Sequence, residues 1–371
     1  MSLLPFVVAA PFMLLTLGAA FTYLYAWLIE RRFPPTGRFI DVEGCRIHYR
    51  EEGPKGAPAR GTIVLLHGAS SNLVESMLGL GTHLSGKYRV IAIDRPGHGW
   101  SERRPGLSEA EPARQAALVA GALRQLGVGN AVVVGHSWSG TIVPHFALDH
   151  EDVTGAIVVL SGITSPWPGG YSGWFERLVD SWAGWLMFRT LAVPILLVLR
   201  PWMERTTFRP QPPPPGILTR AFIPLAFRPR AYEANMQDFA VMYHAVLHQS
   251  ARYRDIRLPT LVIAGDSDEI VWTDLHSRAF ARDVPGAELN LMPGIGHMPQ
   301  YADQKTVLAA IEALAERIAP AKVGASDPKV QVHFWVRCSR SIKPERRVPG
   351  SRRRCAPCWW RPACRKACLP R

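Results

Sequence analysis

Cysteine is scarce in most of this 371-residue sequence, and an excess of charge of either sign is missing there as well. Only Cys45 precedes residue 324, and a single thiol cannot form an internal disulfide, so this part of the chain does not depend on an oxidising compartment. The formal net charge of +13 comes mainly from residues 324–371, which hold 13 Lys and Arg against 2 Asp and Glu. The preceding residues are nearly neutral, so no nucleic-acid partner is expected.

Charged side chains are absent from Ser2 to Ile29, and this apolar run is long enough to cross a bilayer, which takes roughly 20 residues. Aromatic residues typical of the membrane interface lie near its end: Tyr23, Tyr25 and Trp27. A cleaved signal peptide is the alternative, but no basic segment precedes the run, which is also too long for such a peptide. Residues 1–32 are therefore predicted to be an uncleaved, single-pass transmembrane anchor.

The basic residues around this run indicate its orientation. Arg31, Arg32 and Arg38 follow the run, whereas no Lys or Arg precedes it. Because basic residues favour the cytoplasmic side of a membrane span, the rest of the chain is predicted to lie on the cytoplasmic side.

Residues 38–320 contain short apolar runs that alternate with helical patterns. The runs are Thr62–Leu66, Val90–Ile93, Ala131–Val134, Ala156–Leu160 and Leu261–Ala264. Strands that are apolar on both faces are typical of a parallel sheet covered by helices. Helical patterns occur at Glu111–Leu126 and Lys305–Ile318, and an alternating segment over residues 39–49 predicts a hairpin before the first apolar run. An α/β fold is therefore expected.

Two segments depart from this pattern. Residues 161–230 hold five tryptophans and a run of four prolines, which indicates a helical insertion between the two halves of the α/β domain, 38–160 and 231–320. Residues 324–371 mix Arg, Pro, Cys and Trp without a period, so a disordered basic tail is expected. The spacing of the cysteines in the tail is unlike that of common zinc modules, so no metal site is predicted.

A possible nucleophile follows the third of these apolar runs. The hexapeptide Gly135–Gly140 reads G-H-S-W-S-G and is followed by a helix-compatible stretch. Strand, tight turn and helix form the setting of a nucleophile elbow, which would raise the Ser137 hydroxyl to a helix N-terminus. Ser139 stands where this motif usually has glycine, but it is still small enough for the turn. A lone motif of this kind also occurs by chance, so a catalytic role for Ser137 requires a base and a carboxylate elsewhere in the sequence.

A serine nucleophile needs a base and a carboxylate that orients the base. His297 is the candidate base, because it lies in a glycine-rich loop between a late apolar run and the final helical pattern. The run Leu261–Ala264 ends in a loop that offers three acids: Asp266, Asp268 and Glu269.

Residues 38–319 resemble the α/β-hydrolase superfamily, in the branch that carries a helical cap. The resemblance rests on the elbow and on three further motifs: Leu65–Gly68, the D-x-P-G-x-G-x-S loop Asp94–Ser101, and the G-x-x-D-x-I-V run Gly265–Val271. It implies the α/β-hydrolase fold, with mostly parallel strands, flanking helices and a cap at residues 161–230. The last of these motifs selects Asp268 over Asp266 as the triad acid.

The resemblance also implies the roles of individual residues. The catalytic residues would be Ser137, Asp268 and His297, in the chain order that this family uses. The backbone N–H groups of Ala69 and Trp138 would form the oxyanion hole. Three neighbouring side chains would stabilise loops rather than catalyse: His67, Asp94 and His98. No metal and no nucleotide or redox cofactor is implied.

The predicted activity is the hydrolysis of small apolar carboxylic esters, lipid-derived ones included, by a membrane-anchored serine esterase. Serine at the elbow argues against epoxide hydrolases and haloalkane dehalogenases, whose cap-domain enzymes use Asp there. A proline iminopeptidase-like aminopeptidase or amide hydrolase stays open, although the H-G-G-P-G loop of that family is absent. A non-catalytic ligand-binding protein of the same fold is the other alternative.

The composition of the cap also predicts which acyl groups the enzyme prefers. Its tryptophans, together with Phe175, Leu178, Leu186 and Phe188, would give it an apolar underside that favours medium-chain acyl groups. The alternative is that these side chains only pack the cap onto the sheet.

Overall fold

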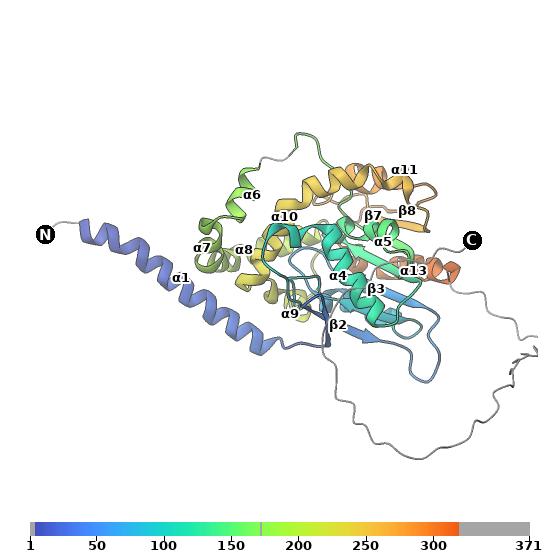
Figure 1. Cartoon of the computed structure of the whole chain (residues 1–371), viewed down its shortest axis with the longest axis horizontal. Helices are drawn as coiled ribbons and strands as arrows, with labels where there is room; N and C mark the ends of the chain where they lie inside the picture. Colours follow the sequence, from blue (N-terminus) through green and yellow to red (C-terminus); the bar gives the residue numbers. More distant parts are fainter. Residues whose placement is uncertain (1–3, 171–172, 319–371) are drawn as a thin grey trace, which may run out of the picture. The chain divides into compact units, whose positions relative to one another are not determined.

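The computed structural model describes residues 4–170 and 173–318, which include a sheet flanked by helices (Figure 1). The eight strands are β1 (Arg38–Val42), β2 (Cys45–Glu52), β3 (Thr62–Leu66), β4 (Arg89–Ile93), β5 (Ala131–His136), β6 (Thr154–Leu160), β7 (Thr260–Gly265) and β8 (Glu288–Met292), in the order β1-β2-β4-β3-β5-β6-β7-β8. The first two strands pair antiparallel, as do β2 and β4, and all other pairs are parallel. The predicted tail, 324–371, lies outside the described residues.

The apolar runs of the sequence form the central strands. The predicted run Thr62–Leu66 coincides with β3, and the other four lie within β4, β5, β6 and β7. All residues of β5, β6 and β7 are buried. By contrast, β8 at the sheet edge is partly exposed. Burial on both faces explains why these strands lack the alternation of a half-exposed sheet.

The chain between β6 and β7 is mainly helical. Its helices are α6 (Trp174–Val179), α7 (Trp182–Thr190), α8 (Ala192–Phe208), α9 (Ile217–Arg220) and α10 (Pro229–Ser250), with a 3-10 turn at Ile223–Phe227. The axes of α7 and α8 differ by 63° at a short break. Pro201 lies inside α8, and Pro229 begins α10 at a position where proline fits without losing a helical hydrogen bond.

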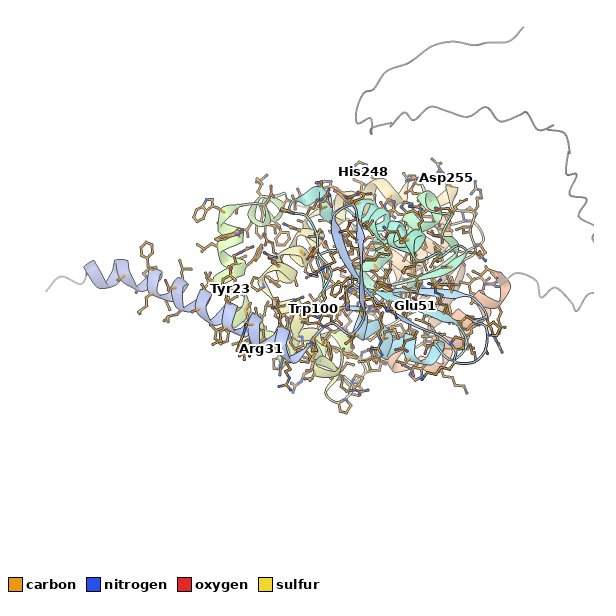
Figure 2. The ribbon with its side chains drawn as sticks, turned by 60° about the horizontal axis from the view of Figure 1, so that its bottom comes forward. Tyr23, Arg31, Glu51, Trp100, His248 and Asp255 are labelled. Atoms are coloured by element: carbon orange, nitrogen blue, oxygen red, sulfur yellow. The ribbon has the colours of Figure 1, made fainter. Side chains whose placement is uncertain are left out.

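Helix α1 (Leu4–Arg32) contacts this helical segment. The buried Thr22 hydroxyl donates to the carbonyl of Thr190 at 3.4 Å, and a Cβ atom at Gly18 would lie 2.6 Å from the same oxygen. At the end of α1, Trp100 donates its indole N–H to the carbonyl of Phe33 at 3.1 Å (Figure 2). By length and composition α1 could cross a membrane.

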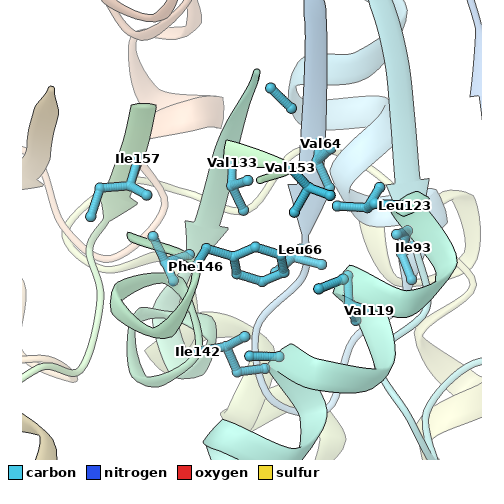
Figure 3. Packing of buried hydrophobic residues seen from close by; sticks show 14 of the residues in the cluster. Val64, Leu66, Ile93, Val119, Leu123, Val133, Ile142, Phe146, Val153 and Ile157 are labelled. Carbon is cyan, nitrogen blue, oxygen red and sulfur yellow. The ribbon is translucent and has the colours of Figure 1, made fainter. Parts of the chain in front are cut away.

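Helices cover both faces of the sheet and bury its side chains. The remaining helices are α2 (Leu73–Ser76), α3 (Thr82–Leu84), α4 (Pro112–Gln125), α5 (Val143–Asp149), α11 (Ala279–Asp283), α12 (Pro299–Ala302) and α13 (Gln304–Ile318). On one face, Val119 of α4 and Phe146 of α5 pack against strand residues such as Val133 (Figure 3). On the other face, α13 contributes Val307 and Ile311. The predicted helices 111–126 and 305–318 correspond to α4 and α13.

Candidate active site

The turn after β5 holds Ser137 in a strained backbone conformation. Its φ angle is +54°, in the left-handed region that residues with a side chain rarely adopt. The turn is closed so tightly that a Cβ atom at Gly135 would lie 2.3 Å from the Val143 side chain. Ser139 also has a function of its own, since its hydroxyl donates to the carbonyl of His67 at 2.5 Å. The structure therefore explains a small residue at both positions that flank Ser137 in the motif.

Three side chains predicted from separate motifs lie in hydrogen-bonded series. The Nε2 atom of His297 lies 2.9 Å from the Ser137 hydroxyl, and its Nδ1 atom lies 2.8 Å from Oδ2 of Asp268. All three residues are buried. The other Asp268 oxygen accepts the N–H groups of Ile270 and Val271, both at 2.9 Å. These bonds fix the orientation of the carboxylate.

The neighbouring acid Asp266 has a different environment. It is exposed, and its carboxylate accepts the Gly294 N–H at 2.7 Å and the Ser267 hydroxyl at 2.9 Å. Of the two acids, Asp268 therefore contacts His297 and Asp266 does not.

The loop after β3 runs beside the serine. A Cβ atom at Gly68 would lie 3.0 Å from Cβ of Ser137. The next N–H, that of Ala69, has no acceptor among the described residues. Trp138 lies in the first turn of the 3-10 helix Ser137–Thr141, where N–H groups have no intrahelical acceptor. Both N–H groups predicted for an oxyanion hole thus belong to segments that border Ser137.

The three side chains expected to support loops have structural partners. The Asp94 carboxylate accepts the N–H groups of Leu73 and Trp100 at 2.7 and 2.8 Å. Burial lowers the pKa values of His67 and His98 well below the usual range, with a further contribution from the Arg95 guanidinium. Neutral histidines of this kind serve as hydrogen-bond partners within the loops.

The sequence reasoning missed a buried ionic cluster beneath the elbow. Arg95 lies 4.2 Å from the ring centroid of Trp138 and is fully buried. Its guanidinium contacts the carboxylate of Asp238 at 2.7 Å, and Arg103 contacts the second oxygen of that carboxylate at 2.5 Å. In addition, Gln115 donates to Asp238 at 3.0 Å. The cluster therefore connects the loop after β4 to helix α10.

A second residue of α10 holds the loop after β3. Asn235 accepts the N–H of Ser70 at 2.8 Å and donates to its hydroxyl at 3.0 Å. Ser70 has a φ angle of +50°, so this contact stabilises a strained turn next to Ala69. In the sequence, Asn235 and Asp238 resemble ordinary exposed positions of a helix. Only their spacing of three, which places them on one helix face, hints at a shared contact.

A pocket of about 130 Å³ opens at Ser137 and His297. The α/β body supplies one wall, including Gly68, Ala69 and Glu75, and the segment between β6 and β7 supplies the other, which is mainly apolar: Met203, Phe208, Ile217, Leu218, Ala221, Ile223 and Phe227. Burial raises the pKa of Glu75, whose carboxylate accepts the Gln300 amide at 3.2 Å. A carboxyl group with a raised pKa suits an apolar pocket, because its neutral form costs less to bury.

The residues that line this pocket differ from those predicted for the underside of the cap. None of the described tryptophans of residues 161–230 lines it, and Trp174, Trp182, Trp185 and Trp202 are 50–78% exposed. Phe188 instead packs in a buried cluster with Val179 and Ala240. The expectation was wrong because aromatic composition does not determine which face of a helix is buried.

Two further observations bear on the chemistry of the site. Burial lowers the pKa of His136, next to the serine, to about 3, and its Nε2 atom lies 3.1 Å from the carbonyl of His297. Within residues 4–170 and 173–318, no group of three His, Cys, Asp or Glu side chains is placed to hold a metal ion.

Known proteins resemble this chain over much of its length. The family described as alpha/beta hydrolase fold matches residues 61–304. A 2-hydroxy-6-oxo-6-phenylhexa-2,4-dienoate hydrolase of Burkholderia cepacia is 25% identical over 277 residues, or 72% of this chain and 91% of that protein. Epoxide hydrolase A of Mycobacterium tuberculosis is 32% identical, but over 34% of this chain and 38% of its own length.

Two solved structures illustrate the similarity in three dimensions. A thermophilic esterase from Thermogutta terrifontis superposes with a TM-score of 0.61 at 21% identity, over 76% of this chain and all of that chain. A membrane phospholipase A, described as a bacterial virulence factor, superposes with a TM-score of 0.59 at 23% identity, over 86% of this chain and 97% of that chain. At these identities the likeness concerns the fold.

Proposed function

The chain belongs to the α/β-hydrolase fold family, and on that premise we propose that it is a serine hydrolase that cleaves carboxylic esters with an apolar acyl group. The family match and the similar structures confirm the fold and the assignment as a hydrolytic enzyme that the sequence motifs indicated. The observation that carries the finer proposal is the hydrogen-bonded series from Asp268 through His297 to Ser137.

In the proposed reaction, the Ser137 hydroxyl oxygen attacks the ester carbonyl carbon while Nε2 of His297 accepts its proton. Asp268 orients the imidazole through Nδ1 and stabilises the imidazolium. The N–H groups of Ala69 and Trp138 stabilise the negative oxygen of the tetrahedral intermediate. His297 then protonates the leaving alcohol, and it next takes a proton from water, which attacks the acyl-serine. The acid is released and the serine regenerated.

The pocket supports an apolar acyl group as the preferred substrate. The wall from the segment between β6 and β7 is mainly Met, Phe, Ile, Leu and Ala side chains, together with Arg200, Glu204 and Thr207. Each methylene that moves from water to such a wall contributes roughly 0.8 kcal/mol. Acyl chains of about six to ten carbons should therefore be cleaved with a higher kcat/KM than acetyl esters.

We also propose that α1 is an uncleaved membrane anchor, with the catalytic body on the cytoplasmic side. A signal peptide is removed, whereas α1 contributes Thr22 and Ile29 to buried contacts with the segment between β6 and β7. Its end is held by an ion pair between Glu30 and Arg228 at 3.1 Å. Extraction of membranes with alkaline carbonate tests the anchor, and full recovery of the intact chain in the supernatant would contradict it.

The first experiment asks whether Ser137 is an activated nucleophile. The full-length protein in detergent is treated with a fluorophosphonate probe, alongside Ser137→Ala and the matched control Ser139→Ala. We expect covalent labelling of the unsubstituted chain and of Ser139→Ala, and none of Ser137→Ala. Absence of labelling in a folded, unsubstituted chain would favour a non-catalytic binding protein.

The second experiment measures kcat/KM for p-nitrophenyl esters of increasing chain length and for proline arylamides. Rising values from acetyl to medium-chain esters are expected. A flat or falling series would show that the pocket does not bind the acyl chain. Faster cleavage of proline arylamides than of any ester would replace the esterase proposal with the aminopeptidase alternative.

A further inference from the structure

Helix α8 exposes a stripe of large apolar side chains. Ile195, Val198, Leu199 and Trp202 follow the spacing i, i+3, i+4, i+7 and are 53%, 79%, 44% and 64% exposed. This set is called the outer stripe below. On α7, Trp182 and Trp185 are 78% and 50% exposed. A contiguous exposed apolar surface of this kind marks a binding surface rather than ordinary surface variation.

The opposite side of α8 lines the pocket. Met203, Thr207 and Phe208, again at helical spacing, face the cavity that opens at Ser137. Helix α8 is thus a wall one helix thick between the outer stripe and the candidate active site. Its 17 residues extend about 26 Å, less than the roughly 30 Å of a bilayer core, so α8 is too short to span a membrane alone.

Contacts with α1 place this surface at the level of the membrane boundary. The 29 residues of α1 extend about 43 Å, which exceeds the bilayer core, so its charged end lies outside the core. The contact between Thr22 and Thr190 lies about 15 Å before that end. Tyr25 of α1 also packs against the buried cluster of Leu196, Ala226 and Phe227. These contacts place the end of α7 and the start of α8 beside the part of α1 that carries the aromatic residues Tyr23 and Trp27.

Basic side chains accompany the aromatic residues. The Arg31 guanidinium lies 3.9 Å from the Trp27 ring centroid, and that of Arg189 lies 4.5 Å from the Trp185 ring centroid. Arg205 of α8 is exposed, whereas Arg200 lines the pocket. Arg189 also forms an ion pair with Glu233 at 2.7 Å. Tryptophan and arginine side chains at one level are typical of proteins that contact lipid headgroups.

We propose that the outer stripe and the exposed tryptophans of α7 insert into the interfacial layer of the bilayer that holds α1, so that the pocket takes its ester from the lipid phase. The proposal rests on the membrane anchor proposed above and extends it to a second contact. The apolar stripe and the exposed arginines together match a lipid surface, which offers acyl chains beside anionic headgroups.

The test places the photoreactive residue p-benzoylphenylalanine at one position at a time in the full-length chain, in vesicles of phosphatidylcholine and phosphatidylglycerol. The positions are Leu17 on α1, Leu199 on the outer stripe and Leu247 on α10, which are 59%, 44% and 43% exposed. Leu247 is the matched control, because it lies about 27 Å along α10 from the end near Arg228. Its neighbour His248 lies away from Tyr23 and Arg31 in Figure 2.

Lipid adducts are expected at positions 17 and 199 and not at 247. Without an adduct at position 17 the anchor itself fails. An adduct at 17 together with none at 199, or with equal adducts at 199 and 247, overturns the second contact. A crosslink from position 199 to another copy of this chain also overturns it, because the surface would then be a dimer interface.

A functional readout separates lipid access from the chemistry. Trp182→Ser combined with Trp202→Ser should lower turnover of a vesicle-borne medium-chain ester by about tenfold or more, with turnover of a water-soluble ester unchanged. Equal loss on both substrates, or no loss on either, contradicts the proposal. If the unsubstituted chain cleaves neither ester, the proposed esterase function fails, while the adduct pattern still decides the membrane contact.

Discussion

The α/β body and the helices between β6 and β7 differ in how far they bury their large apolar side chains. Every residue of β5, β6 and β7 is buried, whereas α7 and α8 expose Trp182 and Trp202 by 78% and 64%. The central strands of the body bury their apolar side chains against other parts of the same chain. The helical segment buries the side chains on one side and exposes those on the other. Four predictions test this difference between the two regions.

The largest effect is expected at the elbow of the body. Ser137→Ala should lower kcat by up to about 10⁶-fold with the fold retained, because the variant loses the nucleophile. Asp268→Asn should lower kcat by about 10⁴-fold, since the imidazole loses its orienting carboxylate. The matched control is Asp266→Asn, which changes an exposed carboxylate and should have little effect. Steady-state kinetics with a p-nitrophenyl ester and circular dichroism provide the comparison.

The buried ion cluster that joins the body to α10 should be the next most sensitive. Asp238→Ala leaves the Arg95 and Arg103 guanidinium groups buried without their shared carboxylate, which should cost about 3–5 kcal/mol of unfolding free energy. Asp274→Ala removes an exposed ion pair with Arg278 and should change stability by less than about 0.5 kcal/mol. Urea unfolding in detergent measures both, and similar values for the two variants would contradict the cluster's importance.

The helical segment itself contains both a buried and an exposed aromatic ring, which can be compared. Phe188→Ala removes a buried ring and should lower the unfolding free energy by about 3–5 kcal/mol. Trp182→Ala removes a larger ring that is 78% exposed, and a change within about 0.5 kcal/mol is expected. The measurement is urea unfolding in detergent. A large loss for Trp182→Ala there would show that this ring packs inside the protein.

The smallest effect concerns pH at the junction between body and helical segment. Burial lowers the pKa of His276 to about 4, and its Nδ1 atom accepts the N–H groups of Thr164 and Ser165 at 3.3 and 3.2 Å. Between pH 6.5 and 4 the unfolded chain binds a proton that the folded chain does not, so stability falls as pH falls. His276 contributes at most about 1.4 kcal/mol per pH unit to this slope.

Two variants isolate that contribution. His276→Gln should flatten the dependence of unfolding free energy on pH in this window, whereas His83→Gln, at an exposed position, should not. An unchanged slope in His276→Gln would mean that the pKa of His276 does not differ between the folded and the unfolded chain. The remaining slope in the variant includes His136, whose pKa of about 3 has the same sign of effect.

The sequence predicted those parts of the molecule that depend on local pattern. Continuous apolar runs located the central strands. Local sequence patterns predicted Ser137, Asp268 and His297 as a triad, and the structure brings these three side chains within hydrogen-bond distance. The contacts of Asn235 and Asp238 were not predicted, because their partners come from distant loops. No local sequence pattern distinguishes a buried polar position from an exposed one. The predicted orientation of the tryptophans was wrong for a similar reason, because their orientation depends on what packs against α7 and α8.

The left-handed backbone of Ser137 has an evolutionary consequence. Glycine adopts a φ of +54° without strain, so selection for stability alone would favour glycine at this position. A serine that persists there in descendants of this gene would indicate continued selection for its hydroxyl group. Replacement by glycine or asparagine would instead mark a lineage in which turnover no longer matters. The conformation of a single residue thus offers a way to separate working hydrolases from inactive ones among related sequences.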